Sequence, residues 1–137
     1  MKKIRRSLCP ISYSLDLFGD RWTLLILRDM VFMGKQHYRE FLKSGEGIAT
    51  NILADRLSRL ESAGLVTKES DPADAKRYVY SLTEKGLDVL PVLVEIIVWG
   101  ASHDPDTPVT SAFLDRLRSD RAGFLAEVRQ KVLARAK

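Results

Sequence analysis

Apolar residues return every three or four positions along most of this sequence, which is the spacing of one face of an α-helix. The clearest case is the segment 49–63, in which Leu53, Leu57 and Leu60 form a narrow apolar stripe. Gly64 follows at the position where a left-handed residue commonly ends a helix. The same spacing predicts further helices over residues 10–18, 20–32, 37–43, 83–102 and 110–136.

The pattern changes in the middle of the chain. Residues 65–69 and 77–82 are short segments rich in β-branched and aromatic residues, which favour strands, and the polar stretch 71–76 predicts a turn between them. We expect a hairpin with a loop of about six residues. A hairpin that directly follows the helices 37–43 and 49–63 is typical of a helix-turn-helix with a wing. The expected fold class is α+β, mainly α.

Two residues mark expected breaks in the helical pattern. Asp20 precedes the second helix, where its carboxylate can accept hydrogen bonds from the first free backbone N–H groups. Pro91 lies near the start of the segment 83–102 and is expected to kink it. We divide the chain into a winged helix-turn-helix domain, residues 1–102, and a linker with a C-terminal helix, residues 103–137, that we expect to serve dimerisation.

The outer side of the segment 49–63 carries polar residues. With the three leucines facing inward and about 100° per residue, Asn51 faces outward and Arg59 lies beside that face. Thr50 and Asn51 stand at the N-terminal end, which enters the major groove in a helix-turn-helix. Asparagine pairs with adenine, arginine with guanine, and threonine offers a methyl or hydroxyl group. The alternative interpretation is an ordinary solvated helix face.

Basic residues flank this segment on both sides. Lys76 and Arg77 lie near the turn of the expected wing, where a cation commonly reaches a phosphate or the adjacent minor groove. Asp71 and Asp74 reduce the positive charge there, and one of them is expected to pair with Arg77 and brace the loop. On the preceding helix and its approach, the residues that could hold the DNA backbone are Lys35, Arg39 and Lys43.

Composition describes one ordinary globular domain of 137 residues, with 45% hydrophobic and 29% charged residues and a net charge of +4. The charge is uneven: segment 49–82 is neutral, segment 83–109 carries −4, and the two ends carry +4 each. A segment that is both acidic and apolar is expected in the core or between two subunits, not on DNA. Its longest apolar stretch is interrupted by Glu95 and falls short of the roughly 18 residues that a membrane span needs.

The single cysteine, Cys9, excludes a disulfide within the chain and a cysteine-based zinc cluster. Because the basic start is not followed by a clean apolar run, we expect a cytoplasmic protein. Cys9 precedes a helix and follows Arg5 and Arg6, and both features favour the reactive thiolate. The alternative is a small apolar residue that only packs.

Catalysis is not expected. The two histidines, His37 and His103, stand in no nucleophile, metal-ligand or phosphate-loop arrangement, so the sequence predicts neither an enzyme nor a cofactor. Trp22, Trp99 and Phe113 could line a pocket for a small molecule, but we interpret these aromatic residues as core.

Four separated motifs resemble those of a known family. They are the residues CPI at 9–11, LFGDRWTLLILRD at 17–29, GIATNILADRL at 47–57 and YSLTEKG at 80–86, followed by WG at 99–100. In this order they resemble the HxlR-type transcriptional regulators, relatives of the MarR winged helices, over about residues 8–102.

The resemblance implies a bacterial or archaeal DNA-binding homodimer that binds a palindromic operator in double-stranded DNA, with terminal helices joining the subunits. By the same resemblance, the family's recognition helix and wing map onto Thr50, Asn51, Arg56, Arg59, Lys76 and Arg77. Some similar proteins use a cysteine at the position of Cys9 to sense oxidants or electrophiles, so an oxidant or small-molecule effector is expected. The competing hypothesis is a winged helix used only for protein–protein contact.

The sequence departs from the family pattern in three places. His37 and Tyr38 replace the Arg-Phe pair often seen there, which weakens the expectation of a DNA backbone contact at position 37. The wing residues 71–74 are more similar to the wing of MarR proteins than to the proline-rich wing of many HxlR-type proteins. The segment from Thr110 onward lies beyond the resemblance.

Overall fold

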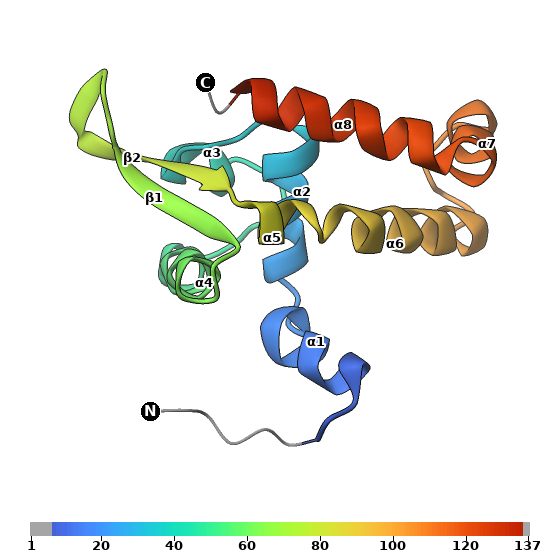
Figure 1. Ribbon diagram of the computed structural model, residues 1–137, viewed down its shortest axis with the longest axis horizontal. Helices are drawn as coiled ribbons and strands as arrows, with labels where there is room; N and C mark the ends of the chain where they lie inside the picture. Colours follow the sequence, from blue (N-terminus) through green and yellow to red (C-terminus); the bar gives the residue numbers. More distant parts are fainter. Residues whose placement is uncertain (1–6, 136–137) are drawn as a thin grey trace.

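The computed structural model describes residues 7–135 and shows a mainly helical winged helix-turn-helix with one two-stranded antiparallel sheet (Figure 1). Its elements are α1 (Pro10–Phe18), α2 (Thr23–Phe32), α3 (Tyr38–Leu42), α4 (Thr50–Ser62), β1 (Val66–Asp71), β2 (Asp74–Leu82), α5 (Glu84–Leu87), α6 (Leu90–His103), α7 (Ser111–Ser119) and α8 (Arg121–Arg135). The expected fold class is confirmed.

The core forms where α2, α3 and α4 meet the start of β1. The predicted apolar stripe of α4 is buried in this core, because Leu53, Leu57 and Leu60 are each at most 3% exposed. Phe41 of α3 is buried beside them and meets the ring of Tyr80 edge-on, with 6.3 Å between ring centroids. The wing strand β2 is therefore anchored in the same core that holds the helix-turn-helix.

The hairpin is longer and its turn tighter than the sequence predicted. The strands pair in one register from Val66 opposite Leu82 to Ser70 opposite Tyr78, and after a register shift Asp71 pairs with Asp74. Only residues 72–73 lie between the strands, so the expected loop of about six residues is wrong. Side-chain hydrogen bonds explain the tight turn. Oδ1 of Asp71 accepts the N–H of Ala73 at 2.9 Å, and Oδ1 of Asp74 accepts the N–H of Lys76 at 3.0 Å. Aspartates commonly stabilise turns in this way.

Two long helices expected from the sequence are each broken in two. The segment 83–102 forms α5 and α6 with a turn at residues 88–89, so Pro91 starts a new helix instead of kinking a continuous one. The segment 110–136 forms α7 and α8, because the chain leaves the helical conformation at Asp120 (φ −131°, ψ 49°). After this break α8 runs back beside α6 toward the wing (Figure 1).

The returning helix α8 belongs to the core of its own chain. Phe124, Val128 and Val132 are all buried. The ring of Phe124 meets the rings of Phe32 and Phe113 at centroid distances of 6.4 and 5.5 Å. The C-terminal apolar face that was expected to serve dimerisation is thus used within the chain, and dimerisation through residues 103–137 stays a prediction.

Two apolar faces are left exposed by the residues that the structure describes, 7–135. Helix α1 has no buried residue and projects from the body (Figure 1), with Ile11 and Leu15 exposed. Helix α6 exposes Ile96 and Trp99, and Trp99 is 68% exposed, so its interpretation as a core residue is wrong. Its other side is buried through residues such as Val94.

By length and hydropathy alone, residues 84–103 could also cross a membrane. We interpret this segment as a core helix pair, because the turn at residues 88–89 interrupts it. Leu90, Leu93 and Val94 are also buried in the protein.

Candidate nucleic-acid interface

The N-terminal end of α4 is exposed and fixed in place. Thr50 and Asn51 are exposed there, as predicted for an end that enters the major groove. The hydroxyl of Tyr38, on α3, donates to the backbone oxygen of Thr50 at 2.8 Å. Arg59, a little over two turns further along α4, keeps 68% of its side chain accessible and pairs with Asp55 at 2.9 Å.

Arg56 is placed differently from the other predicted DNA-binding residues. Its side chain is only 16% exposed, and its Nε donates to Oδ2 of Asp20 at 2.8 Å. It also forms a short ion pair with Asp55. These contacts fasten α4 to the start of α2, whereas the sequence had grouped Arg56 with residues that face DNA.

Asp20 performs two tasks at once. It accepts hydrogen bonds from the N–H groups of Trp22 and Thr23 and from the Thr23 hydroxyl at 2.9, 3.2 and 2.5 Å, so it caps α2 as predicted. Burial raises the pKa of Asp20, but the bonds from Thr23, Arg56 and the backbone outweigh it and lower the pKa to about 2. The carboxylate is therefore charged throughout the neutral range.

The turn between α3 and α4 is held by a second ion pair that the sequence did not reveal. Arg28 of α2 donates to Glu46 at 2.8 Å and also contacts the buried Asp29 at 2.9 Å. The hydrogen bond from Arg28 lowers the pKa of Glu46. Glu46 lies between Gly45 and Gly47, whose φ angles of 88° and 76° require glycine. The two glycines indicate a turn at Glu46, but the sequence does not indicate its ion pair with Arg28, which lies 18 residues away.

The wing presents the predicted cations at its tip. Lys76 and Arg77 are both exposed. Arg77 donates to Oδ2 of Asp71 at 2.8 Å and lies 3.9 Å from Asp74, so the expected local pairing is confirmed. Half of the Arg77 side chain remains accessible.

A lysine–aromatic pair on the wing was missed. Nζ of Lys68 lies 4.2 Å from the centre of the Tyr78 ring, and Tyr78 is 49% exposed. The register places Lys68 opposite Tyr80, so Tyr78 is its diagonal neighbour on the same face. The alternating tyrosines of β2 are the pattern that could have indicated it. A cation held over an exposed ring offers a nucleic acid both a charge and an apolar surface.

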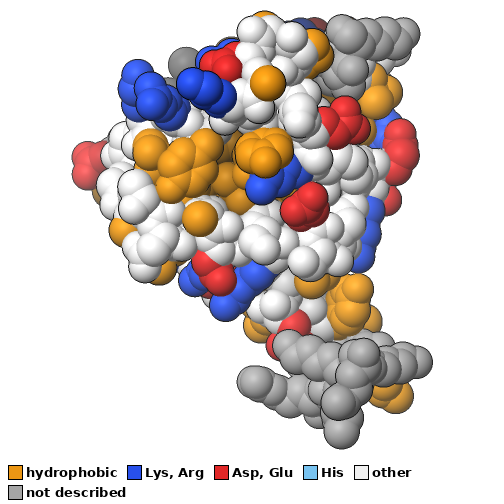
Figure 2. Space-filling model, turned by 90° about the vertical axis from the view of Figure 1, so that its left-hand side faces the viewer, with side chains coloured by type: hydrophobic (Ala, Val, Ile, Leu, Met, Phe, Trp, Pro, Cys, Tyr) orange, Lys and Arg blue, Asp and Glu red, His pale blue; other side chains and the backbone are white. Residues whose placement is uncertain are grey.

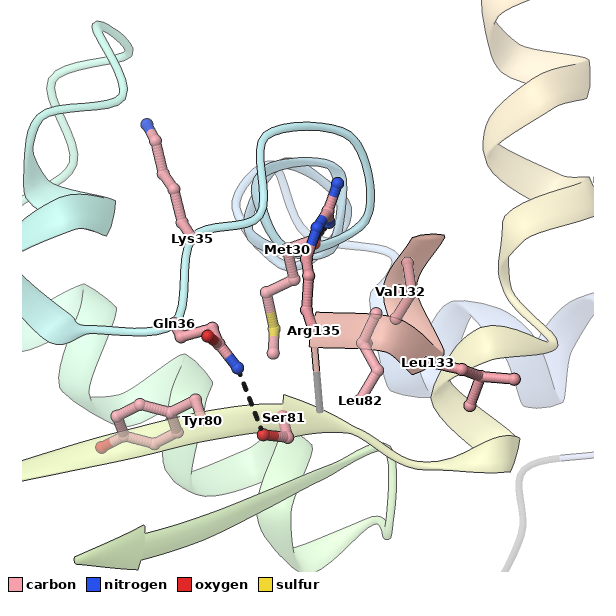
Figure 3. A pocket seen from close by; sticks show the side chains of 9 residues that line it. All are labelled: Met30, Lys35, Gln36, Tyr80, Ser81, Leu82, Val132, Leu133 and Arg135. Carbon is pink, nitrogen blue, oxygen red and sulfur yellow. Dashed lines mark hydrogen bonds between the residues drawn. The ribbon is translucent and has the colours of Figure 1, made fainter. Parts of the chain in front are cut away.

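The base of the wing is tied to the connection between α2 and α3. The N–H of Tyr80 donates to the oxygen of Gln36 at 2.8 Å, and Nε2 of Gln36 reaches Oγ of Ser81 at 3.5 Å (Figure 3). Gln36, Tyr80 and Ser81 line a small pocket together with Arg135, the last residue of α8. Arg135 donates to the backbone oxygens of Met30 and Val31 at 3.2 and 3.0 Å.

The basic residues in and around α3 divide into two groups. Arg39 and Lys43 are exposed and available to a ligand, as predicted. The Lys35 side chain is only 17% exposed, and its Nζ lies 3.7 Å from Oδ2 of the buried Asp29, so Lys35 forms an internal ion pair. Figure 2 shows this side of the molecule, where Lys and Arg side chains lie around a central group of apolar side chains.

Cys9 is exposed at the start of α1, and its N–H donates to Oγ of Ser7 at 3.2 Å. The alternative of a buried packing residue is therefore wrong. Arg5 and Arg6, which were expected to favour the thiolate, lie outside the described residues.

Asp20→Ala should lower the free energy of unfolding by about 1–2 kcal/mol at neutral pH, because it removes the cap of α2 and the partner of Arg56. The contribution of a carboxylate with a lowered pKa is present above its ordinary value of 3.8 and is lost as the pH falls toward about 2. Urea unfolding at several pH values should show the variant and the wild type converging in that range. Asp16→Ala, at an exposed position of α1, is the control. A constant difference down to the lowest pH would contradict this account.

Comparisons with known proteins agree with this geometry. A family model described as HxlR-like helix-turn-helix matches residues 17–107. The HTH-type transcriptional regulator sll1512 of Synechocystis is 34% identical over 87 residues, which cover 64% of each chain.

Solved structures are also similar. The crystal structure of PA1607 shares 37% identity at a TM-score of 0.69, covering 77% of this chain and 74% of that one. The structure of the redox regulator HypR in its reduced form shares 28% identity at a TM-score of 0.63, covering 71% of this chain and 95% of that one. The chain spans just under two thirds of the length of sll1512, one of the curated relatives that it matches. It belongs to the HxlR-like helix-turn-helix family.

Proposed function

We propose that the protein is a cytoplasmic transcriptional regulator that binds double-stranded DNA as a homodimer on a palindromic operator. The observation that carries this proposal is the N-terminal end of α4, which is exposed at Thr50 and Asn51 while the leucine stripe of the helix is buried. Membership of the HxlR-like family supports the same conclusion.

In this proposal α4 enters the major groove and the wing lies on the adjacent backbone or minor groove. Asn51 reads adenine, Arg59 reads guanine and Thr50 contributes a methyl or hydroxyl contact. The cations that hold phosphates are Arg39, Lys43, Lys76 and Arg77. Arg56 positions α4 through Asp20 and does not reach a base, because its guanidinium is largely covered.

Net charge contributes little to this recognition. Segment 49–82, which contains α4 and the wing, is neutral in sum. Within this segment, Arg56 pairs with Asp55 and Arg77 pairs with Asp71, so part of its charge is neutralised inside the protein. Affinity therefore depends on where a few exposed cations lie, and it should weaken as salt displaces them from phosphates.

Alanine substitutions should separate base readout from backbone contact. Asn51→Ala and Arg59→Ala should each cost about 1–3 kcal/mol on the operator and relax the choice of one base. Lys76→Ala should weaken all sequences alike and reduce the salt slope by about one. Arg118→Ala, on α7 at the far end of the molecule, is the charge-matched control (Figure 1). Binding can be measured by fluorescence anisotropy on operator and scrambled duplexes at several salt concentrations.

The competing hypothesis of a protein–protein module makes the opposite prediction. It expects no preference for any duplex and no steep salt dependence in the wild-type protein. Equal binding by all four variants and the wild type would likewise contradict the assignment of these residues.

The homodimer is supported by the apolar faces of α1 and α6. Ile11 and Leu15 of α1, and Ile96 and Trp99 of α6, are exposed large hydrophobic residues. Exposed apolar patches on a soluble domain commonly mark an interface, and a two-fold dimer would bring the same patch of each subunit together. The acidic charge of segment 83–109 keeps this surface away from DNA.

Ile96→Lys should convert the dimer into a monomer at micromolar concentration, since it places a charge in the proposed apolar interface. Met33→Lys is the matched control, because Met33 is a similarly exposed hydrophobic residue outside α1 and α6. Sedimentation velocity reports the mass of each form. A monomeric wild-type protein, or a variant that remains dimeric, would exclude this interface.

We also propose that Cys9 makes the regulator responsive to oxidants. It is exposed at the start of the uncovered helix α1, and the similar HypR is named a redox regulator. The chain holds one cysteine, so a disulfide must join two subunits. In that step the two Cys9 thiols lose two protons and two electrons, which reduce an azo oxidant such as diamide to its hydrazine.

Diamide should produce a disulfide-linked dimer on a non-reducing gel and change operator affinity, and dithiothreitol should reverse both effects. Cys9→Ser should show neither response while binding the operator like the untreated wild type. An affinity change of equal size in the serine variant, or no change in the wild type, would reject the sensor.

A further inference from the structure

His37 lies between the first turn of α3 and the tip of the wing, although 34 residues separate it from Asp71. Its Nε2 lies 3.1 Å from Oδ2 of Asp71, at the end of β1. Its Nδ1 lies 2.8 Å from Oε1 of Glu40, one turn along α3. Both nitrogens of the imidazole therefore face carboxylates.

Asp71 connects this histidine to a DNA-binding candidate. Its Oδ2 also accepts the hydrogen bond of Arg77, and its Oδ1 accepts the N–H of Ala73 in the turn. Asp71 is only 8% exposed, which is unusual at the tip of a hairpin. The contacts run in an unbroken line from α3 through His37 and Asp71 to Arg77.

We propose that His37 is a positioning residue that ties the wing tip to α3 and thereby holds Arg77 where it meets DNA. The proposal rests on the proposed function for its consequence at DNA, but the tie itself is a property of the free protein. The base of the wing is already fastened by Gln36 and Tyr80. His37 adds a second contact to the helix-turn-helix nearer the tip of the wing, at Asp71.

The tie should depend on pH. An imidazole that carries a proton on both nitrogens donates to both carboxylates, whereas a neutral imidazole donates to only one. The acceptors stay charged, because the N–H of Ala73, and then Arg77 and His37, keep the pKa of Asp71 low against the effect of burial. Burial raises the pKa of Glu40, but hydrogen bonds from His37 and Gln36 outweigh it and lower the pKa.

The charged groups around the imidazole come from each element that it contacts. They are Glu40 on α3, Asp71 on β1 and, through Asp71, Arg77 and Asp74 on β2. The carboxylates of Glu40 and Asp71 directly face the ring, and the cation Arg77 is itself paired with Asp71. A protonated His37 therefore strengthens the line of contacts and does not oppose it.

The tie can be tested without DNA by amide hydrogen exchange at Ala73. After correction for intrinsic exchange rates, the wild type should show about three- to tenfold more protection at about pH 6 than at about pH 8. His37→Gln should remove this dependence. His103→Gln, at the other histidine of the chain, should behave like the wild type.

The consequence for DNA is tested by operator affinity at the same two pH values. The wild type and His103→Gln should bind more tightly at the lower pH by a similar factor, and His37→Gln should lack this extra factor. Asp71→Asn removes the carboxylate on the wing side of the same contact and should also lose the pH-dependent factor. This second variant tests the tie even if His37→Gln fails to fold.

The outcomes separate the tie from the proposed function. If wild-type protection at Ala73 does not change with pH, or changes equally in His37→Gln, the tie is refuted. If protection behaves as expected but the wild type selects no DNA, the tie stands and the proposed function fails.

Discussion

The position of α4 depends on one narrow apolar contact, and the candidate interface is arranged around it. Leu53, Leu57 and Leu60 bury one line of the helix against the core. Ile52 and Arg56 beside this line are half-buried, and the other residues of the helix are exposed. Asn51 lies on the side of the helix opposite this line, and Thr50 is exposed at the first residue of the helix. A helix held along a single line can still roll about it, so its orientation needs further constraints.

Polar contacts provide those constraints at the edges of α4. Arg56 ties its middle to the cap of α2, and Tyr38 ties its first turn to α3. The turn before it is held by Arg28 and Glu46. Charge-assisted hydrogen bonds have defined directions, so they fix rotation where apolar packing alone would not. Polar contacts thus join α4 and the turn before it to α2 and α3.

Local periodicity predicted the features of the fold that depend on near neighbours in the chain. The leucine stripe, the order of elements as far as the hairpin and the cap at Asp20 are all short-range patterns, and each is confirmed. The break at Asp120 was missed because apolar spacing continues across it from α7 into α8. Exposure of Trp99 was missed because a helical pattern identifies an apolar face without saying whether the same chain covers it.

The candidate site could be predicted only in part, because some of its contacts join residues that are far apart in the sequence. Exposed side chains such as Asn51 can be inferred from the direction of the helix face, whereas the partner of Arg56 lies 36 residues away and depends on the tertiary fold. The resemblance to the family placed Arg56 among DNA contacts because it compares positions and not contacts. Three-dimensional packing assigns it to holding the helix.

The central claim is that α4 and the wing of two subunits read DNA together. Selection of duplexes from a random pool by the full chain, followed by footprinting of the enriched sequence, tests this claim most directly. We expect two half-sites related by two-fold symmetry, with centres about 10 base pairs or a multiple of that apart. No enrichment over the starting pool, or enrichment of a single unrepeated site, would contradict it.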